Sequence, residues 1–345
     1  MYLSLKEIKK LIFSNFPNEK ADIIALHLKD KCFINNNKLY TLTPYISYDV
    51  TLGAKIENKL LNSVTKLMQQ SYDKLEDLEK TEISSIKKWS QAFNNSDVRT
   101  YFAQLQEAIT VDKTLDDYFD EIHFKNGVYD LAKGTFKPRK VGKHYITYYI
   151  TYDYVKPSKK QIDRVKAIVR KTFPLSKDYR CMCLILGAAL TGRSVDDQTM
   201  LFLLGHASSG KSNILAMTEL AVQKYFVQLK DDIFAMGTTT ADKVFNTFNT
   251  QLFIRFAFVN EIKDKRCDPS VFKQFNDGKL QTVALYKDGS ESFEHRAKLI
   301  CAANNLPNIV ADEAIIRRLK AYLTTARFVE NKSEVDESKH IYLKD

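Results

Sequence analysis

The sequence predicts an α/β protein in which a P-loop NTPase core with a parallel sheet follows a smaller α+β N-terminal domain and a helical connector. Three observations predict this fold class. Residues 205–212 form a phosphate-loop motif between an apolar run and a helical pattern. Two further apolar runs, at residues 252–259 and 298–303, have the composition of buried parallel strands. The chain up to about residue 150 mixes helix and strand signals.

The N-terminal part is predicted from local patterns. Apolar residues at helical spacing predict helices over residues 5–13 and 56–67. Residues 38–42 follow an asparagine-rich turn and are typical of a strand. Residues 124–131 contain an Asn-Gly pair, which favours the tight turn of a hairpin. Alternating Tyr, Thr and Ile at residues 145–152 favour sheet over a set of base-stacking tyrosines.

A boundary is predicted at residues 156–160, where proline and charge break the pattern and Ser158 can cap a helix. That helix has an apolar stripe and many Lys and Arg residues, a face that commonly meets water but also suits an acidic ligand. A second apolar helix, residues 181–190, precedes the phosphate loop. The predicted organisation is an N-terminal domain (1–154), a helical connector (155–195), the NTPase domain (196–330) and a C-terminal tail (331–345).

Residues 205–212 read Gly-His-Ala-Ser-Ser-Gly-Lys-Ser and fit the pattern G-x-x-x-x-G-K-[ST]. In such a loop backbone N–H groups surround the β-phosphate, the lysine reaches the β and γ oxygens, and the serine hydroxyl ligates Mg²⁺. The apolar run at 200–204 and the helical pattern from residue 213 favour a functional loop over a chance match. The predicted nucleotide-binding residues are Gly205, Ser208, Ser209, Gly210, Lys211 and Ser212.

Polar residues end the other two predicted strands. The carboxylate of Glu261 can polarise the attacking water, and Asn260 can help to hold the Mg²⁺ shell. Asn304 can orient that water against the γ-phosphate, although a turn-forming asparagine is the default in isolation. Arg318 can stabilise the charge of phosphoryl transfer in an adjacent subunit. The predicted catalytic residues are therefore Lys211, Glu261, Asn304 and Arg318.

Composition sets the remaining limits. A chain of 345 residues is long enough for two domains, and 44% hydrophobic with 27% charged residues is typical of a soluble globular protein. We see neither a membrane-length apolar run nor a secretory signal, so we expect an intracellular protein. The five scattered cysteines support neither a zinc site nor a disulfide framework. A net charge of +10 is compatible with a polyanionic partner.

The order and spacing of these motifs resemble the superfamily 3 helicases, specifically the helicase half of poxvirus-type primase-helicases of large DNA viruses and phages. The resemblance covers about residues 120–325. Residues 276–293 are similar to the presensor hairpin of that family, and residues 303–307 to its sensor-1 asparagine and proline. Residues 126–131 resemble the signature of the preceding domain. The loop differs in having Ser209 where relatives often have asparagine.

This resemblance implies an AAA+-like core that forms a hexameric ring on single-stranded or forked DNA and hydrolyses ATP, with Mg²⁺, between subunits. Ser212 and Asn260 are then the expected metal ligands, and Lys279, Tyr286 and Lys287 the expected DNA contacts. A separate primase or polymerase is an expected partner, and the expected location is a viral or element replication site in the host cytoplasm or nucleus. The alternatives are a DNA-packaging motor and a non-enzymatic, ATP-binding replication scaffold.

Overall fold

The computed structural model describes residues 2–13, 16–29, 31–35, 38–42, 48–52, 55–84, 103–112, 114–139, 145–194, 196–236, 248, 251–262, 266–283, 290–309 and 312–344. The chain divides into two compact units, Met1–Leu115 with Lys140–Thr147, and Asp116–Arg139 with Tyr148–Asp345. The boundary predicted at residue 154 falls inside the second unit. None of the helices in the described ranges combines the length and apolar character that a bilayer-spanning segment needs.

The first unit is a small α+β structure. Its helices are α1 (Leu5–Phe13), α2 (Pro17–Leu28), α3 (Lys55–Asp73) and α4 (Asp77–Ser84). Its antiparallel sheet consists of β1 (Cys32–Asn35), β2 (Lys38–Leu42) and β3 (Tyr48–Leu52), in that order. Ile8, Ile24 and Leu60 are fully buried in its core. The helices predicted at 5–13 and 56–67 and the strand at 38–42 are confirmed.

The second unit begins with a three-stranded antiparallel sheet made of β4 (Glu121–Phe124), β5 (Gly127–Asp130) and β6 (Thr135–Lys137). Three arginines from later in the chain hold the segment before β4. Arg255, only 2% exposed, donates to the carbonyl of Tyr118 at 2.7 Å. Arg296 pairs with Asp117, and Arg193 pairs with Asp120 at 3.0 Å. These contacts explain why the second unit starts at residue 116.

Two local predictions in this region need correction. The β4–β5 hairpin turns on Lys125 and Asn126, because Phe124 pairs with Gly127, so the Asn-Gly pair does not form the turn. Asn126 instead exchanges two hydrogen bonds with the backbone of Tyr154. Residues 145–152 form no strand apart from a single bridge at Ile150.

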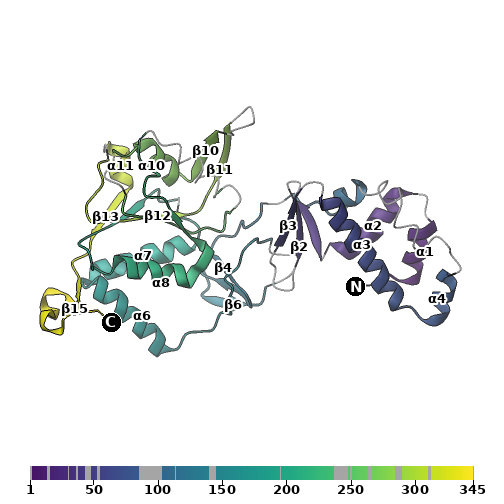
Figure 1. Cartoon of the computed structure of the whole chain (residues 1–345), viewed down its shortest axis with the longest axis horizontal. Coiled ribbons are helices and arrows are strands. Elements are labelled where there is room, and N and C mark those ends of the chain that lie inside the picture. Colours follow the sequence, from purple (N-terminus) through teal and green to yellow (C-terminus); the bar gives the residue numbers. More distant parts are fainter. Residues whose placement is uncertain are drawn as a thin grey trace. The chain divides into compact units, whose positions relative to one another are not determined.

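A five-stranded parallel sheet, ordered β13-β7-β12-β9-β8, forms the centre of the second unit. Its strands are β7 (Met200–Leu204), β8 (Phe226–Leu229), β9 (Phe256–Asn260), β12 (Lys298–Ala303) and β13 (Leu319–Leu323). Helices α7 (Ser176–Leu190) and α8 (Lys211–Val222) lie on one side, and α10 (Pro269–Asn276) and α11 (Glu313–Arg318) on the other (Figure 1). All six residues of β12 are buried, as its apolar sequence predicts. The predicted α/β class with a parallel sheet is confirmed.

The remaining elements border this sheet. Helix α6 (Lys159–Thr172) begins as predicted at Ser158, where Ser158 and Gln161 form a reciprocal capping box. Strands β10 (Lys279–Val283) and β11 (Ser290–Glu294) form an antiparallel hairpin that projects from the unit (Figure 1). The C-terminal strands β14 (Arg327–Val329) and β15 (Ile341–Leu343) pair in parallel. Short 3₁₀ turns are η1 (Gln223–Tyr225), η2 (Lys332–Glu334) and η3 (Glu337–Lys339).

Candidate nucleotide-binding site

The phosphate loop leaves β7 at Gly205, where the backbone lies close to β13. Gly205 has a φ of 142°, and a Cβ atom there would lie 2.1 Å from Oγ1 of Thr324. Thr324 donates to the carbonyl of Leu204 through both its N–H (2.8 Å) and its hydroxyl (2.9 Å). Only glycine fits this approach and this backbone conformation. The loop is therefore fixed at its start by the residue that follows β13.

The end of the loop is fixed by the C-terminal segment. Gly210 caps α8 with a φ of 87°, and a Cβ there would meet Thr172 of α6 at 2.7 Å and Phe328 of β14 at 2.9 Å. Ser208, which also has a positive φ of 60°, accepts a hydrogen bond from the Phe328 N–H at 2.8 Å. This support could not be predicted from the sequence, because it depends on contacts between distant parts of the chain.

Lys211 is the first residue of α8, and only 8% of its surface is exposed. Its ammonium group donates to the carbonyls of Gly205 (2.5 Å) and His206 (3.1 Å) and to Oγ of Ser209 (3.1 Å). Burial lowers the pKa of Lys211, and the charge of Glu261 partly opposes that effect. The ammonium thus lies inside the loop and donates to three neutral oxygen atoms. Charged phosphate oxygens would bind it more strongly than these neutral acceptors do.

The two polar strand ends lie at the same edge of the sheet as the loop, because the strands are parallel. Strand β12 lies between β7 and β9, so Asn304 follows the neighbour of the loop strand, and Glu261 follows the next strand. Glu261 has a φ of 52°, and its N–H donates to the carbonyl of Ala302 at 2.8 Å. Such a conformation in a residue other than glycine is often found at functional sites.

One cavity of about 750 Å³ brings these residues together. Among the predicted site residues, Ser208, Ser209, Gly210, Lys211, Ser212, Asn260, Glu261 and Asn304 line it. Residues without a predicted role also line it, among them Ile168, Lys171, Thr172, Met217, Leu220, Phe328 and Lys344. The basic character of α6 was visible in the sequence, but nothing local indicated that Phe328 and Lys344 line this cavity.

Oxygen donors at two points of this cavity suit Mg²⁺. Ser212 and Asn260 are both exposed to the cavity and offer a hydroxyl and an amide oxygen. The described ranges contain no group of three or more His, Cys, Asp or Glu side chains that could hold a metal ion by themselves. This donor set fits a cation that also takes ligands from phosphate and water.

Arg318 lies outside this cavity. It is 7% exposed and makes an ion pair with Asp277 of the same chain, with 2.5 Å between Nη2 and Oδ1. The adjacent Arg317 is exposed and donates to Gln198 at 2.7 Å. A role of Arg318 in the site of another subunit stays a prediction.

Of the three expected DNA contacts, Lys279 lies in the described part of the chain. It is the exposed first residue of β10, opposite Glu294 of β11. Tyr286 and Lys287 lie outside the described residues.

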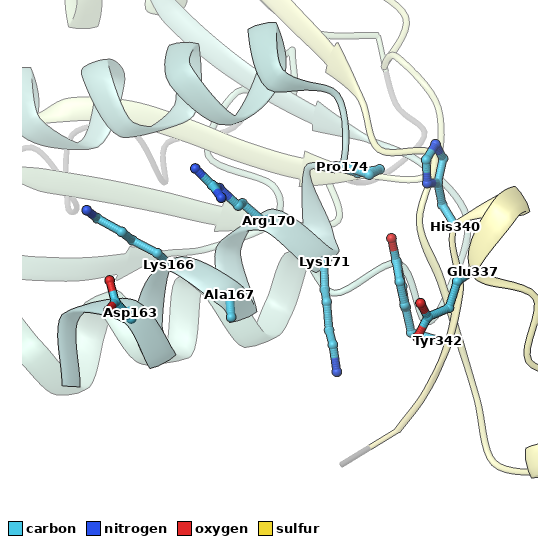
Figure 2. Close-up of a pocket in the computed structure, with 9 residues that line it drawn as sticks. All are labelled: Asp163, Lys166, Ala167, Arg170, Lys171, Pro174, Glu337, His340 and Tyr342. Atoms are coloured by element: carbon cyan, nitrogen blue, oxygen red, sulfur yellow. The ribbon is translucent and has the colours of Figure 1, made fainter. Parts of the chain in front are cut away.

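A second cavity, of about 730 Å³, lies between α6 and the C-terminal segment (Figure 2). Lys166, Arg170 and Lys171 of α6 line it together with His340 and Tyr342 of the C-terminal segment. Arg170 lies 4.9 Å from the ring centre of Tyr179, and Lys171 lies 6.0 Å from that of Tyr342. Lys171 lines both cavities.

Comparison with known proteins bears on the first half of the chain. A family model described as "D5 N terminal like" matches residues 25–174. This segment is similar to the D5 N-terminal domain. The matched segment makes up less than half of the chain. It ends before β7 and so does not include the phosphate loop. No curated protein matches the sequence.

Solved structures are similar over nearly the whole chain. An apo structure of the C-terminal region of NrS-1 aligns with a TM-score of 0.51 at 10% identity and covers 94% of this chain and 66% of that one. A second apo structure of the same region, the A form, gives a TM-score of 0.47 at 9% identity and covers 93% and 64%. This chain thus spans slightly less than two thirds of the first of these structures. At such identity the likeness shows the fold alone.

Proposed function

We propose that this protein is an ATP-dependent DNA helicase of a viral or mobile-element replication system, of the superfamily 3 type with an AAA+-like core. The observation that carries the proposal is the single cavity into which the phosphate loop, Glu261 and Asn304 all project. A loop that only binds nucleotide needs no carboxylate and amide at the adjoining strand ends, whereas hydrolysis needs groups that activate and orient water. The D5 N-terminal-like match supports the replication context.

In this proposal each site residue has one task. Lys211 exchanges its bonds to the loop for bonds to the β and γ oxygens of ATP, and Ser212 and Asn260 hold Mg²⁺, which screens the phosphate charge. Glu261 polarises the attacking water, and Asn304 orients it. Arg318 stabilises the spreading charge in the site of a neighbouring subunit, which requires a ring, for which we propose a hexamer. The β10–β11 hairpin, through Lys279, Tyr286 and Lys287, contacts single-stranded DNA.

The test combines three measurements on one sample of the full chain. We expect a monomer-to-hexamer shift on adding ATP and single-stranded DNA, DNA-stimulated ATP hydrolysis, and unwinding of a forked duplex. A packaging motor would prefer duplex DNA and leave forks intact, and a scaffold would bind ATP with negligible turnover. Either result would replace the helicase proposal with the corresponding alternative.

The hairpin is tested by Lys287→Ala with Lys125→Ala as a matched control. Lys125 is an exposed lysine in the β4–β5 turn of the same unit. We expect Lys287→Ala to lose fork unwinding and to flatten the salt dependence of single-strand binding by about one phosphate contact per engaged subunit. Basal ATP hydrolysis should survive in both variants. Unwinding at the parental rate by Lys287→Ala would remove this residue from the mechanism.

A further inference from the structure

The nucleotide cavity has both polar and apolar lining residues. The polar ones include Lys211, Glu261 and Asn304. The apolar ones come from three elements that are far apart in the sequence, Ile168 of α6, Ala216, Met217 and Leu220 of α8, and Phe328 of β14. Leu220 is 76% exposed, which leaves a large apolar side chain at the cavity wall for a ligand to cover.

The aromatic lining residue lies close to the phosphate loop. Phe328 lies against Gly210, the residue before Lys211, so its ring is at the start of α8. A nucleoside triphosphate with its phosphates at the N-terminus of α8 would have its base between this ring and the first two turns of the helix, where Ala216 and Met217 line the cavity. The N-terminus of a helix favours the phosphates, and the apolar walls favour the flat face of the base.

Phe328 supplies the aromatic wall of the cavity, and its position is fixed. Its N–H donates to Ser208 of the phosphate loop at 2.8 Å, so the loop and β14 hold each other. Its ring lies 5.8 Å from the ring centre of Tyr342 on the paired strand β15. The ring also lies against Gly210, where a Cβ would come within 2.9 Å of it. An aromatic ring held in this way loses little freedom when a base stacks on it.

Two cations border the same region. Lys171 of α6 and Lys344, which follows β15, both line the cavity. The ammonium of Lys344 lies 3.0 Å from a carboxylate oxygen of Glu330, which lies outside the cavity lining. The C-terminal segment therefore brings an aromatic ring and an ammonium group to one cavity, together with the hydrogen bond that holds the loop.

We propose that the C-terminal segment completes the nucleotide site, with Phe328 as the residue on which the nucleobase stacks. This inference rests on the proposed function, because it assumes that the phosphates lie at Lys211. It adds a residue that contacts the base, and it gives residues 327–344 a role in substrate binding.

The experiment compares a ligand that has a base with one that has none. Affinities for ATP and for inorganic tripolyphosphate, both with Mg²⁺, are measured by calorimetry on the full chain and on Phe328→Ala, Phe328→Trp and Tyr342→Ala. We expect Phe328→Ala to weaken ATP binding about tenfold or more and to leave tripolyphosphate binding within about twofold, because only the base loses its stacking partner. Phe328→Trp should retain ATP affinity.

Tyr342→Ala is the matched control. Tyr342 is the aromatic partner of Phe328 on the same β-ribbon, but it lines the second cavity and not the nucleotide cavity (Figure 2). This variant removes one support of the Phe328 ring but no lining residue of the nucleotide cavity, so it should weaken ATP binding much less than Phe328→Ala does.

Three results would overturn the inference. Equal loss of ATP and tripolyphosphate affinity in Phe328→Ala would mean that Phe328 only supports the loop. Equal loss of ATP affinity in Phe328→Ala and Tyr342→Ala would mean that the ribbon, not the ring, matters. Unchanged ATP affinity in Phe328→Ala would exclude stacking. In all three the unmodified protein still binds both ligands. Failure of the premise that phosphates lie at Lys211 would instead appear as binding of neither ligand by the unmodified protein, and failure of the helicase proposal as absence of fork unwinding.

Discussion

Arg318 and Asp277 form an ion pair, with 2.5 Å between Nη2 and Oδ1, that ties the end of α11 to the residue two positions before the β10–β11 hairpin. Arg318 is nearly buried, and its Nη1 also donates to the carbonyl of Ala314 at 3.1 Å. The arginine proposed to act on a neighbouring subunit is thus held, within its own chain, at the base of the element proposed to contact DNA.

Replacing Arg318 tests this relationship. We expect Arg318→Ala to bind ATP normally and to lose turnover by a factor on the order of a thousand or more, the usual contribution of such an arginine. Mixing it with Lys211→Ala protein, under conditions of subunit exchange, should restore part of the activity, because sites with both residues intact form again. The control is Arg317→Ala, since Arg317 is exposed. Loss of turnover in the control alone would assign the role to Arg317.

Substitutions of Lys211 and of Glu261 are expected to impair different steps of ATP turnover. Lys211→Ala should abolish ATP turnover, because no other cation in the described part of the cavity lies within the phosphate loop itself. Glu261→Gln should keep ATP binding and lower hydrolysis by about a hundredfold or more, since the amide cannot activate water. Binding by calorimetry and phosphate release on the same samples separate the two. Equal loss of ATP affinity in both variants would give Glu261 another role.

The burial of His295 is expected to make the stability of the fold depend on pH. His295 is 2% exposed, its Nε2 lies 2.8 Å from the carbonyl of Phe275, and its Nδ1 accepts from the N–H of Ala297 at 3.1 Å. Burial lowers its pKa from 6.5 to about 4, so the folded state keeps the ring neutral. As pH falls from 6.5 to 4 the unfolded chain takes up the proton first, and the free energy of unfolding decreases by about 3 kcal/mol.

This pH dependence is measured by urea unfolding of the protein and of His295→Gln at pH 7 and pH 5. The variant should be less stable at pH 7 and should show a smaller decrease between the two values. Parallel decreases in both proteins would mean that other groups cause the effect.

The ion pair between Lys298 and Asp197 is expected to contribute a coupling free energy to the stability of the fold. Lys298 is the first residue of β12, 4% exposed, and pairs with Asp197 at 2.7 Å and with the Thr199 hydroxyl at 2.5 Å. Burial lowers the pKa of Lys298, and Asp197 partly restores it. Removing Asp197 alone leaves a buried ammonium with a weaker partner, so Asp197→Ala should cost about 2 kcal/mol more than it costs in a Lys298→Met background. Additive effects in this double-mutant cycle would show that the pair contributes no coupling.

The parts of the site predicted from sequence are those that short stretches determine. Ser158 caps α6 through residues three positions away, and the phosphate loop is one continuous segment between β7 and α8. The strand predicted from residue 252 begins only at Phe256, because residues 252–253 form a turn. Local sequence patterns predict that such an element exists more reliably than they predict the residues at which it begins and ends.

Elements that depend on distant partners were not predicted. Strand β13 has a mostly exposed, mixed sequence, and it is a strand because it pairs with β7. The tract at residues 145–152 has high β propensity, yet Tyr148 packs on Tyr225 and Phe253 and its hydroxyl donates to Gln223. Side-chain packing, not backbone pairing, stabilises this tract, and its composition could not distinguish the two.

The hydrogen bond from Phe328 to Ser208 also makes a spectroscopic reporter. An amide hydrogen exchanges with solvent deuterium only when its hydrogen bond opens, so the exchange rate of the Phe328 amide follows the opening of β14 from the phosphate loop. A ligand that orders the phosphate loop lowers the exchange rate of the Phe328 amide without contacting that amide. The nucleotide site can therefore be followed in real time from a backbone position more than a hundred residues further along the chain.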